Sequence, residues 1–237
     1  MQAIIFDVDG TLAETEELHR QSFNEAFAAA GLPWSWDQVL YAKLLEVTGG
    51  KERIRHFIDA YQPGEQMDAG EVAALHRDKT ARYARLVEAG GVALRPGVAR
   101  LIEQAKAAGV RLAIATTTSR PNVDALLRAT LGHDPFEVIA AGDEVGAKKP
   151  APDVYVLALE RLGLPAASCI AVEDTLNGVR SAQGAGLACV VTTSLYGGKG
   201  PFPGAAAILP DLSGDSGACD AIARLLADRS QEGDRPA

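Results

Sequence analysis

Five short apolar runs, separated by helix-like segments, constrain the fold of this chain more than any other feature. They lie at residues 3–6, 112–115, 138–141, 169–172 and 188–191. Each run is apolar throughout rather than alternating, which is typical of strands that are covered on both faces. The helix-like segments 98–108, 153–162 and 177–185 end at or next to glycines, which often terminate helices. Strands that alternate with helices predict an α/β fold with a doubly wound, parallel, Rossmann-like sheet.

The interval from residue 14 to residue 91 breaks this alternation. It has no strand-like run, and its four helix-like stretches are residues 16–30, 38–46, 51–61 and 72–88. We therefore predict two domains, because a helical insertion follows the first strand. Residues 1–13 and 92–237 would form the catalytic core, and residues 14–91 would form a helical cap that sets substrate specificity.

The charge and the cysteine pattern exclude several classes of partner. A formal net charge of −8 argues against nucleic acid, whose phosphate backbone selects a basic surface, but it permits a small phosphate ligand. No apolar stretch reaches transmembrane length, so we expect no membrane partner. Asp7 and Asp9 interrupt the early apolar run, which argues against a signal peptide. Cys169, Cys189 and Cys219 are far apart and form no CxxC pair, so we expect the protein in the reducing cytoplasm. We also expect a monomer.

Polar residues follow four of the apolar runs at the point where each run ends. The first leads into Asp7-Val8-Asp9-Gly10-Thr11 and the second into Thr116-Thr117-Thr118-Ser119. The third leads through a loop to Lys148-Lys149-Pro150, and the fourth leads directly into Glu173-Asp174. Because the carboxyl ends of parallel strands lie at one edge of a sheet, where doubly wound folds bind ligands, we expect these groups to converge.

The acids Asp7, Asp9, Glu173 and Asp174 would repel one another at that edge unless a cation lay among them. Carboxylate oxygens suit Mg²⁺, which also keeps positions for water and phosphate oxygens. A carboxylate left free can attack phosphorus, while Thr116 and a lysine hold the phosphate. An isolated Asp-x-Asp is usually a turn, and Lys-Lys-Pro is usually a solvated loop. The four strand ends together favour phosphoryl-transfer chemistry.

In their order along the chain, these segments resemble the motifs of the haloacid-dehalogenase-like phosphatases. Residues 7–12 match the first motif, Thr116 the second, Lys149 with Pro150 the third, and Glu173-Asp174 the fourth. The resemblance implies that Asp7 is the nucleophile and forms a phospho-aspartate. It implies that Asp9 protonates the leaving alcohol and then activates water, which requires a raised pKa at Asp9 when substrate is bound. Mg²⁺ would be held by Asp7, the backbone carbonyl of Asp9 and Asp174, with Glu173 close by, and Thr116 and Lys149 would hold the phosphoryl group.

The predicted cap carries a second group of basic residues. A glycine turn at residues 49–53 opens a helix and could bind an anion through its free amides, and His76 and Lys79 share a helix face. Solvated helix charges are the ordinary interpretation of such residues. However, residues 13–19, 48–54, 116–119 and 173–178 resemble the CbbY-type xylulose-1,5-bisphosphate phosphatases of carbon-fixing bacteria and plastids, which remove an inhibitor of Rubisco. That resemblance assigns substrate contacts to Glu16, Gly50, Lys51, Arg53, His76, Lys79, Thr117, Thr118, Arg120 and Asn122.

Other functions remain open on these residues. A β-phosphoglucomutase-like isomerase would use the same strand-end motifs, and a phosphoglycolate-type phosphatase would use them on a smaller substrate. A phospho-accepting signalling domain also combines acids, threonine and lysine, but its paired acids come early and it lacks a large helical insertion. His19 lies near the predicted hinge and could relay protons to Asp9, but we interpret it as a surface histidine.

Overall fold

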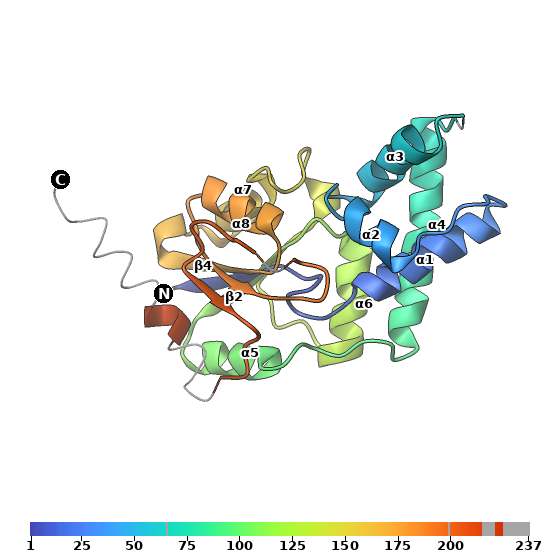
Figure 1. Ribbon diagram of the computed structural model, residues 1–237. Helices are drawn as coiled ribbons and strands as arrows, with labels where there is room; N and C mark the ends of the chain where they lie inside the picture. The colour runs from blue at the N-terminus through green and yellow to red at the C-terminus, as the bar shows by residue number, and fades with distance from the viewer. Residues whose placement is uncertain (65, 199, 215–220, 225–237) are drawn as a thin grey trace, which may run out of the picture.

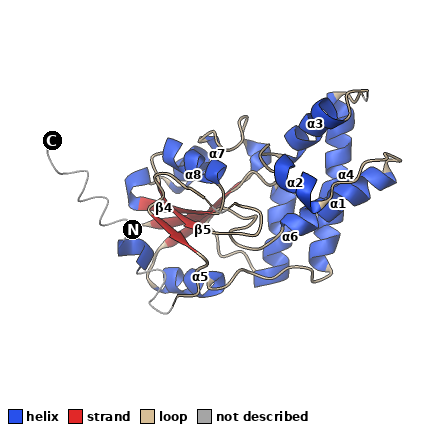
Figure 2. Ribbon diagram, viewed as in Figure 1, coloured by secondary structure: helices blue, strands red, loops and turns tan. Residues whose placement is uncertain are grey.

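Parallel strands form the centre of the computed structural model, which describes residues 1–64, 66–198, 200–214 and 221–224. Within these residues, six strands form one sheet in the order β3-β2-β1-β4-β5-β6, and all neighbours are parallel. Helices lie on both sides of this sheet (Figures 1 and 2). The strands are β1 (Ala3–Phe6), β2 (Arg111–Ala115), β3 (Val138–Ala140), β4 (Cys169–Glu173), β5 (Ala188–Thr192) and β6 (Ala207–Leu209). The chain first adds β2 and β3 on one side of β1 and then adds β4, β5 and β6 on the other side. Doubly wound sheets bind ligands at this switch point, between β1 and β4.

Helices cover both faces of this sheet. Helices α5 (Val98–Ala107) and α6 (Arg120–Leu131) pack on one face together with Ile4 and Phe6 of β1. Helices α7 (Asp153–Leu162) and α8 (Leu176–Gly184) pack on the other face together with Ala3 and Ile5. Short 3₁₀ turns, η1 (Gly142–Glu144) and η2 (Ala166–Ser168), precede α7 and β4. Because both faces are covered, the strands are continuously apolar, as predicted.

The predicted α/β class with a doubly wound parallel sheet is confirmed. Strand β6 was not predicted, because it is only three residues long and lies at the sheet edge, where Ile208 is 52% exposed. Its composition therefore gives little signal of a buried strand. None of the described helices is long and apolar enough to cross a membrane. Cys219 and most of the residues after Gly214 lie outside the described residues.

Four helices between β1 and α5 form a separate group beside the sheet (Figure 1). They are α1 (Glu16–Ala29), α2 (Gln38–Leu44), α3 (Gly50–Tyr61) and α4 (Ala69–Glu88). Phe23 and Phe27 of α1 pack against Trp36 and Phe57, with ring centroids between 4.6 and 6.5 Å apart. The helical group therefore has its own aromatic core, and Trp34 and Trp36 serve in that packing.

Two connections join the helical group to the sheet. The first connection is residues 7–15, which turn at Gly10, and the second is residues 89–97, between α4 and α5. The two connections pair through the bridge between Ala13 and Leu94. Arg95 then ties the connections to β5, because its guanidinium donates to the Gly10 carbonyl, to Thr192 Oγ1 at 3.0 Å and to the Thr193 carbonyl at 2.5 Å. Helix α4 also contacts α6. The helical group thus lies over the carboxyl ends of the strands, where the polar motifs lie.

Candidate active site

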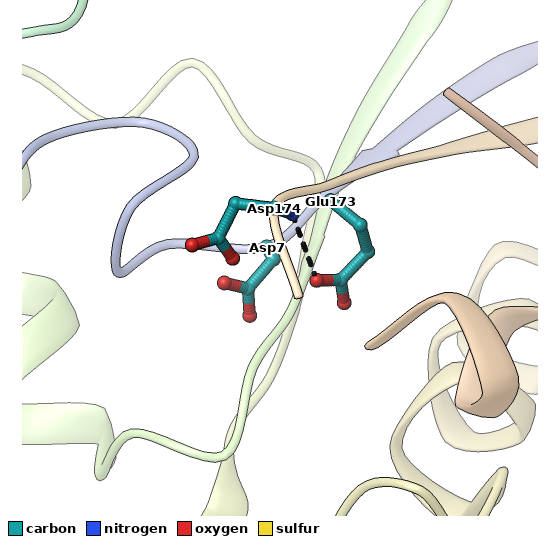
Figure 3. Close-up of side chains that lie close together, drawn as sticks. All are labelled: Asp7, Glu173 and Asp174. Carbon is teal, nitrogen blue, oxygen red and sulfur yellow. Dashed lines mark hydrogen bonds between the residues drawn. The ribbon is translucent and has the colours of Figure 1, made fainter. Parts of the chain in front are cut away.

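Three acids meet at the carboxyl edge of the sheet. Asp7 follows β1, Glu173 ends β4 and Asp174 follows it, so two adjacent parallel strands deliver all three side chains (Figure 3). Each offers a carboxylate oxygen, and these oxygens lie within 4.8 Å of one another. All three are buried, with exposed fractions of 7%, 0% and 3%. Three of the four acids that the sequence predicted to converge therefore form this cluster, and the Asp9 carboxylate is not part of it.

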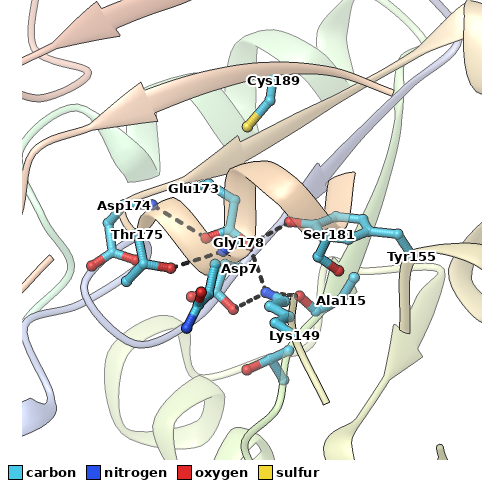
Figure 4. Close-up of polar contacts among 12 residues, drawn as sticks. Asp7, Ala115, Lys149, Tyr155, Glu173, Asp174, Thr175, Gly178, Ser181 and Cys189 are labelled. Atoms are coloured by element: carbon cyan, nitrogen blue, oxygen red, sulfur yellow. Dashed lines mark hydrogen bonds and ion pairs between the residues drawn. The ribbon is translucent and has the colours of Figure 1, made fainter. Parts of the chain in front are cut away.

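Lys149 connects two of these acids. Its Nζ donates to Asp7 Oδ1 at 2.6 Å, to Glu173 Oε1 at 2.6 Å and to the Ala115 carbonyl at 2.9 Å (Figure 4). The Tyr155 hydroxyl donates to the same Glu173 oxygen at 2.7 Å, and the Tyr155 ring centre lies 5.0 Å from the lysine nitrogen. These contacts fix the lysine beside Asp7. They also direct Glu173 toward Lys149 and Tyr155.

The burial of these acids changes their protonation. Burial raises the pKa of Asp7 to about 7, since the neighbouring Glu173 and Asp9 carboxylates add to an effect that Lys149 only partly opposes. Burial also raises the pKa of Asp174 well above its usual value, with further contributions from Asp7 and Glu173. Burial opposes the charge on Lys149, yet the two carboxylates raise its pKa overall. One lysine therefore does not offset the burial of three carboxylates, and Asp7 and Asp174 take up protons more readily than a free aspartate does.

The oxygens of Asp174 differ in a way that fits a bound cation. Ser194 Oγ donates to Oδ2 at 2.6 Å, whereas buried Oδ1 has no hydrogen-bond partner among the described residues. A buried acceptor without a partner is costly, and a cation would satisfy it. Gly10 passes so close that a Cβ there would lie 2.1 Å from Asp174 Oδ2, and its φ of +79° also favours glycine. The oxygen-rich donor set therefore suits Mg²⁺.

Asp9 lies on the other side of the turn, between the sheet and the helical group. Its Oδ1 accepts from Thr15 Oγ1 at 2.5 Å and contacts His19 Nε2 at 2.9 Å, and its Oδ2 accepts from the Thr118 hydroxyl. Burial alone would raise the pKa of Asp9, but the interactions with His19, Thr118 and Thr15 outweigh it and lower the pKa overall. In the free protein these donors therefore stabilise the Asp9 carboxylate. The raised pKa that we expect when substrate is bound stays a prediction.

His19 is not the surface histidine that the sequence suggested. Only 5% of it is exposed, and it stacks on Tyr83 with a centroid separation of 4.1 Å. Its Nδ1 lies 2.5 Å from Lys79 Nζ, which has hydrogens to donate, so the other ring nitrogen carries the hydrogen that faces Asp9. His19 lies four residues before buried Phe23 on α1. That helical spacing was the available signal for burial.

A cavity of about 750 Å³ separates the strand ends from the helical group. Its lining includes these expected site residues from the sheet domain: Asp7, Asp9, Thr116, Thr117, Thr118, Asn122, Lys149, Glu173 and Asp174. It also includes these expected residues from the helical group: Glu16, Gly50, Lys51, Arg53, His76 and Lys79. Arg120 differs from the prediction. Its exposed side chain donates to Asp124 at 2.8 Å on the surface of α6, because the pair has the i,i+4 spacing of helix neighbours.

The helical side of the cavity is basic and tightly packed. Arg53 is held by the Leu44 carbonyl at 3.2 Å and by Tyr41 Oη at 3.3 Å, and Tyr41 donates to Glu16 at 2.6 Å. A Cβ at Gly50 would lie 2.3 Å from His76 Nε2, so glycine allows the imidazole to approach this turn. Burial and nearby Lys79 lower the pKa of His76 to about 3. Burial also lowers the pKa of Lys79 to about 7, although Asp9 opposes this.

Comparison with known proteins agrees with this geometry. Residues 1–186 match the family described as haloacid dehalogenase-like hydrolase. The chain belongs to this family, and the enzyme class that the motifs predicted, a haloacid-dehalogenase-like phosphatase, is confirmed.

Within the family, the chain is similar to proteins named CbbY. It is 54% identical over 216 residues to Protein CbbY from Cereibacter sphaeroides, which covers 90% of this chain and 93% of that protein. The crystal structure of CbbY from Rhodobacter sphaeroides with phosphate superposes with a TM-score of 0.86 at 51% identity, covering 93% of this chain and 99% of the other. A mutant of the same protein in complex with xylulose 1,5-bisphosphate gives a TM-score of 0.84 at 52% identity, covering 90% and 95%.

Proposed function

We propose that this protein hydrolyses a phosphate ester of a small sugar bisphosphate, most specifically xylulose 1,5-bisphosphate. The observation that carries the proposal is a single cavity with basic groups on two opposite sides. Lys149 lies on the sheet side, and Arg53 and Lys79 lie on the helical side. A sugar that carries two phosphates needs such groups at both ends. The similar CbbY structure with bound xylulose 1,5-bisphosphate supports this substrate.

In the first chemical step, a carboxylate oxygen of Asp7 attacks phosphorus and the bond from phosphorus to the sugar oxygen breaks. Lys149 holds Asp7 in place through a 2.6 Å hydrogen bond and contributes positive charge beside the transferring group. Thr116, which is buried at the end of β2, is placed to donate a hydrogen bond to a phosphate oxygen. The products of this step are a phospho-aspartate at position 7 and a sugar alcohol.

Asp9 manages the protons of both steps in this proposal. It gives a proton to the leaving sugar oxygen and then takes one from the water that attacks the phospho-aspartate, which restores Asp7 and releases inorganic phosphate. Since Asp9 is ionised in the free protein, it must first take up a proton. His19 Nε2 lies 2.9 Å away, with Lys79 behind it, so this pair is the route that we propose for that proton.

A magnesium ion would be held by Asp7 and Asp174, with the Asp9 carbonyl as a further ligand in this proposal. When bound, it would neutralise carboxylate charge and polarise the phosphate oxygens. We also propose that residues 14–91 act as a specificity cap over the site. Its contribution is the basic wall formed by Arg53, His76 and Lys79.

Phosphate release from a panel of substrates tests the proposal. The panel contains xylulose 1,5-bisphosphate, ribulose 1,5-bisphosphate, 2-phosphoglycolate and glucose 1-phosphate, each assayed with Mg²⁺. We expect the highest kcat/KM with xylulose 1,5-bisphosphate. A preference for 2-phosphoglycolate would contradict the role of the cap. Conversion of β-glucose 1-phosphate to glucose 6-phosphate without phosphate release would identify a mutase.

A further inference from the structure

The loop that follows β5, residues 193–198, contacts both the proposed magnesium site and the helical group. On one side, Ser194 Oγ donates to Asp174 Oδ2 at 2.6 Å. On the other side, the Tyr196 hydroxyl donates to Glu17 Oε2 of α1 at 2.7 Å. A single residue, Leu195, therefore separates a contact with an acid of the site from a contact with the cap. No sequence motif pointed to this loop.

Ser194 binds one oxygen of Asp174 and leaves the other, Oδ1, available to the proposed cation. With Oδ2 engaged by the serine, the carboxylate is fixed so that buried Oδ1 stays without a protein partner. Groups that hold a metal ligand in this way orient it, and their loss usually weakens metal binding. Ser194 in turn accepts a hydrogen bond from the Gly197 amide at 2.7 Å, so the hydroxyl itself is held in place.

The loop is packed directly on Asp174. A Cβ at Gly197 would lie 2.4 Å from the Asp174 carbonyl oxygen and 2.7 Å from Asp174 Oδ2, so the backbone approaches as closely as glycine permits. A change in the position of Asp174 must therefore move the loop, because the contact leaves no free space to absorb it.

Tyr196 connects this loop to the helical group. Its ring packs edge-on against Tyr41 of α2 with centroids 5.8 Å apart, while its hydroxyl binds Glu17 of α1. The Leu195 amide also donates to Glu14 Oε2 at 3.4 Å, in the first connection between the domains. Arg20 and Gln38 hold Glu17 on its own side. The loop thus contacts the hinge and two cap helices.

We propose that Ser194 is a positioning residue for the magnesium ligand Asp174, and that residues 194–197 couple occupation of the cation site to the position of the cap. This inference rests on the proposed function, because it requires a cation at Asp174. It adds that the cation orders the first cap helix even when no sugar phosphate is bound.

Calorimetric titration of Mg²⁺ alone into the full chain tests the positioning role. We expect Ser194→Ala to weaken Mg²⁺ binding by about 10- to 100-fold, and Ser194→Cys, which retains a weaker donor, to give an intermediate affinity. The matched control is Ser181→Ala, which removes a buried hydroxyl that donates to the Ala151 carbonyl at 2.6 Å instead of to an acid. Its Mg²⁺ affinity should equal that of the wild type. Thermal unfolding without metal verifies that each variant is folded.

Two outcomes separate this inference from the proposed function. If Asp174→Asn binds Mg²⁺ as tightly as the wild type, the metal site itself is wrong. If Asp174→Asn loses binding but both Ser194 variants bind like the wild type, the site stands and the positioning role is overturned.

Hydrogen exchange of residues 14–20, with and without saturating Mg²⁺, tests the coupling. We expect Mg²⁺ to slow exchange there in the wild type. Tyr196→Phe should keep its Mg²⁺ affinity within about twofold but lose this slowing, because it lacks the hydroxyl that binds Glu17 and does not touch Asp174. Equal slowing in the wild type and in Tyr196→Phe, or none in the wild type, would overturn the coupling.

Discussion

At the scale of single residues, the candidate site depends on how buried charges are balanced. Lys149 donates to both Asp7 and Glu173, and all three side chains are inaccessible to water or nearly so. Such an arrangement is stable only while each partner is present, because an isolated buried carboxylate has neither water nor a counter-charge. The same lysine that lowers this cost also lies where the proposed phosphoryl transfer develops negative charge.

Lys149→Met should therefore lose both activity and stability. We expect phosphate release to fall by at least about 10³-fold, and the free energy of unfolding in urea to fall by about 3–5 kcal/mol without metal. Lys148→Met is the matched control, since Lys148 Nζ donates to the carbonyls of Gly142 and Val145 and not to an acid. Equal losses in both variants would show that the loop, rather than Lys149, matters.

His19→Gln tests the proposed proton route. We expect kcat to fall by about 10- to 100-fold with a smaller change in KM, because the imidazole contacts Asp9 and lies outside the phosphate-binding groups. The control is His133→Gln, whose exposed imidazole bonds only to the Leu131 carbonyl among the described residues. A His19→Gln enzyme with unchanged kcat would exclude this route.

At the scale of elements, the strands and their polar ends were predictable and the hinge was not. Continuous apolar runs identified β1, β2, β3, β4 and β5 because both faces of the sheet are covered. The acids at their ends converge because parallel strands end at one edge. Contacts between distant loops leave no such periodic signal. Ser194 and Tyr155 reach the acids through tertiary packing, so their sequence neighbours gave no indication of this position.

Helix α4 gives the protein a predictable sensitivity to acid. The folded pKa of His76 is about 3, whereas an unfolded histidine has a pKa of about 6.5. As the pH falls from 6.5 toward 3, the unfolded chain takes up a proton that the folded chain does not, so stability decreases. Burial causes most of the shift, and the nearby positive charges of Lys79, Lys51 and Arg53 add to it.

His76→Gln should remove this part of the pH dependence. Urea midpoints measured at pH 7.5, 6.0 and 5.0 should decrease less steeply in the variant than in the wild type. Lys79, whose folded pKa is about 7, is present in both proteins, so its titration contributes to both slopes. Parallel slopes in the two proteins would contradict the assignment to His76.

At the scale of the whole molecule, the proposed cation site lies where the sheet and the helical group meet. Asp7 and Asp174 come from the central strands, and the cavity above them is closed by the helical group. The enzyme class was evident from four motifs in their order along the chain. The sequence did not show that Arg53, His76 and Lys79 line the same cavity as the strand-end acids, because tertiary packing brings them together. Arg120 is an example. It follows the polar residues after β2, which line the cavity, but its side chain pairs with Asp124 on the surface of α6.

Magnesium should stabilise the folded chain. At a free concentration 100 times its dissociation constant, Mg²⁺ should add about 2.7 kcal/mol to the free energy of unfolding, because it binds the folded state alone. Asp174→Asn should show no such gain and should be more stable than the wild type in EDTA, since one buried carboxylate charge is removed. Equal stabilisation of both proteins by Mg²⁺ would place the cation elsewhere.

The most direct test of the account is chemical identification of the phosphorylated residue. The enzyme is mixed with its best bisphosphate substrate and Mg²⁺, quenched in acid within milliseconds and treated with borohydride, which converts an aspartyl phosphate to homoserine. We predict homoserine at position 7, detected by peptide mass spectrometry, and none in Asp7→Asn. Homoserine at another aspartate, or active turnover by Asp7→Asn protein shown to be free of deamidation, would contradict the assignment of Asp7 as the nucleophile.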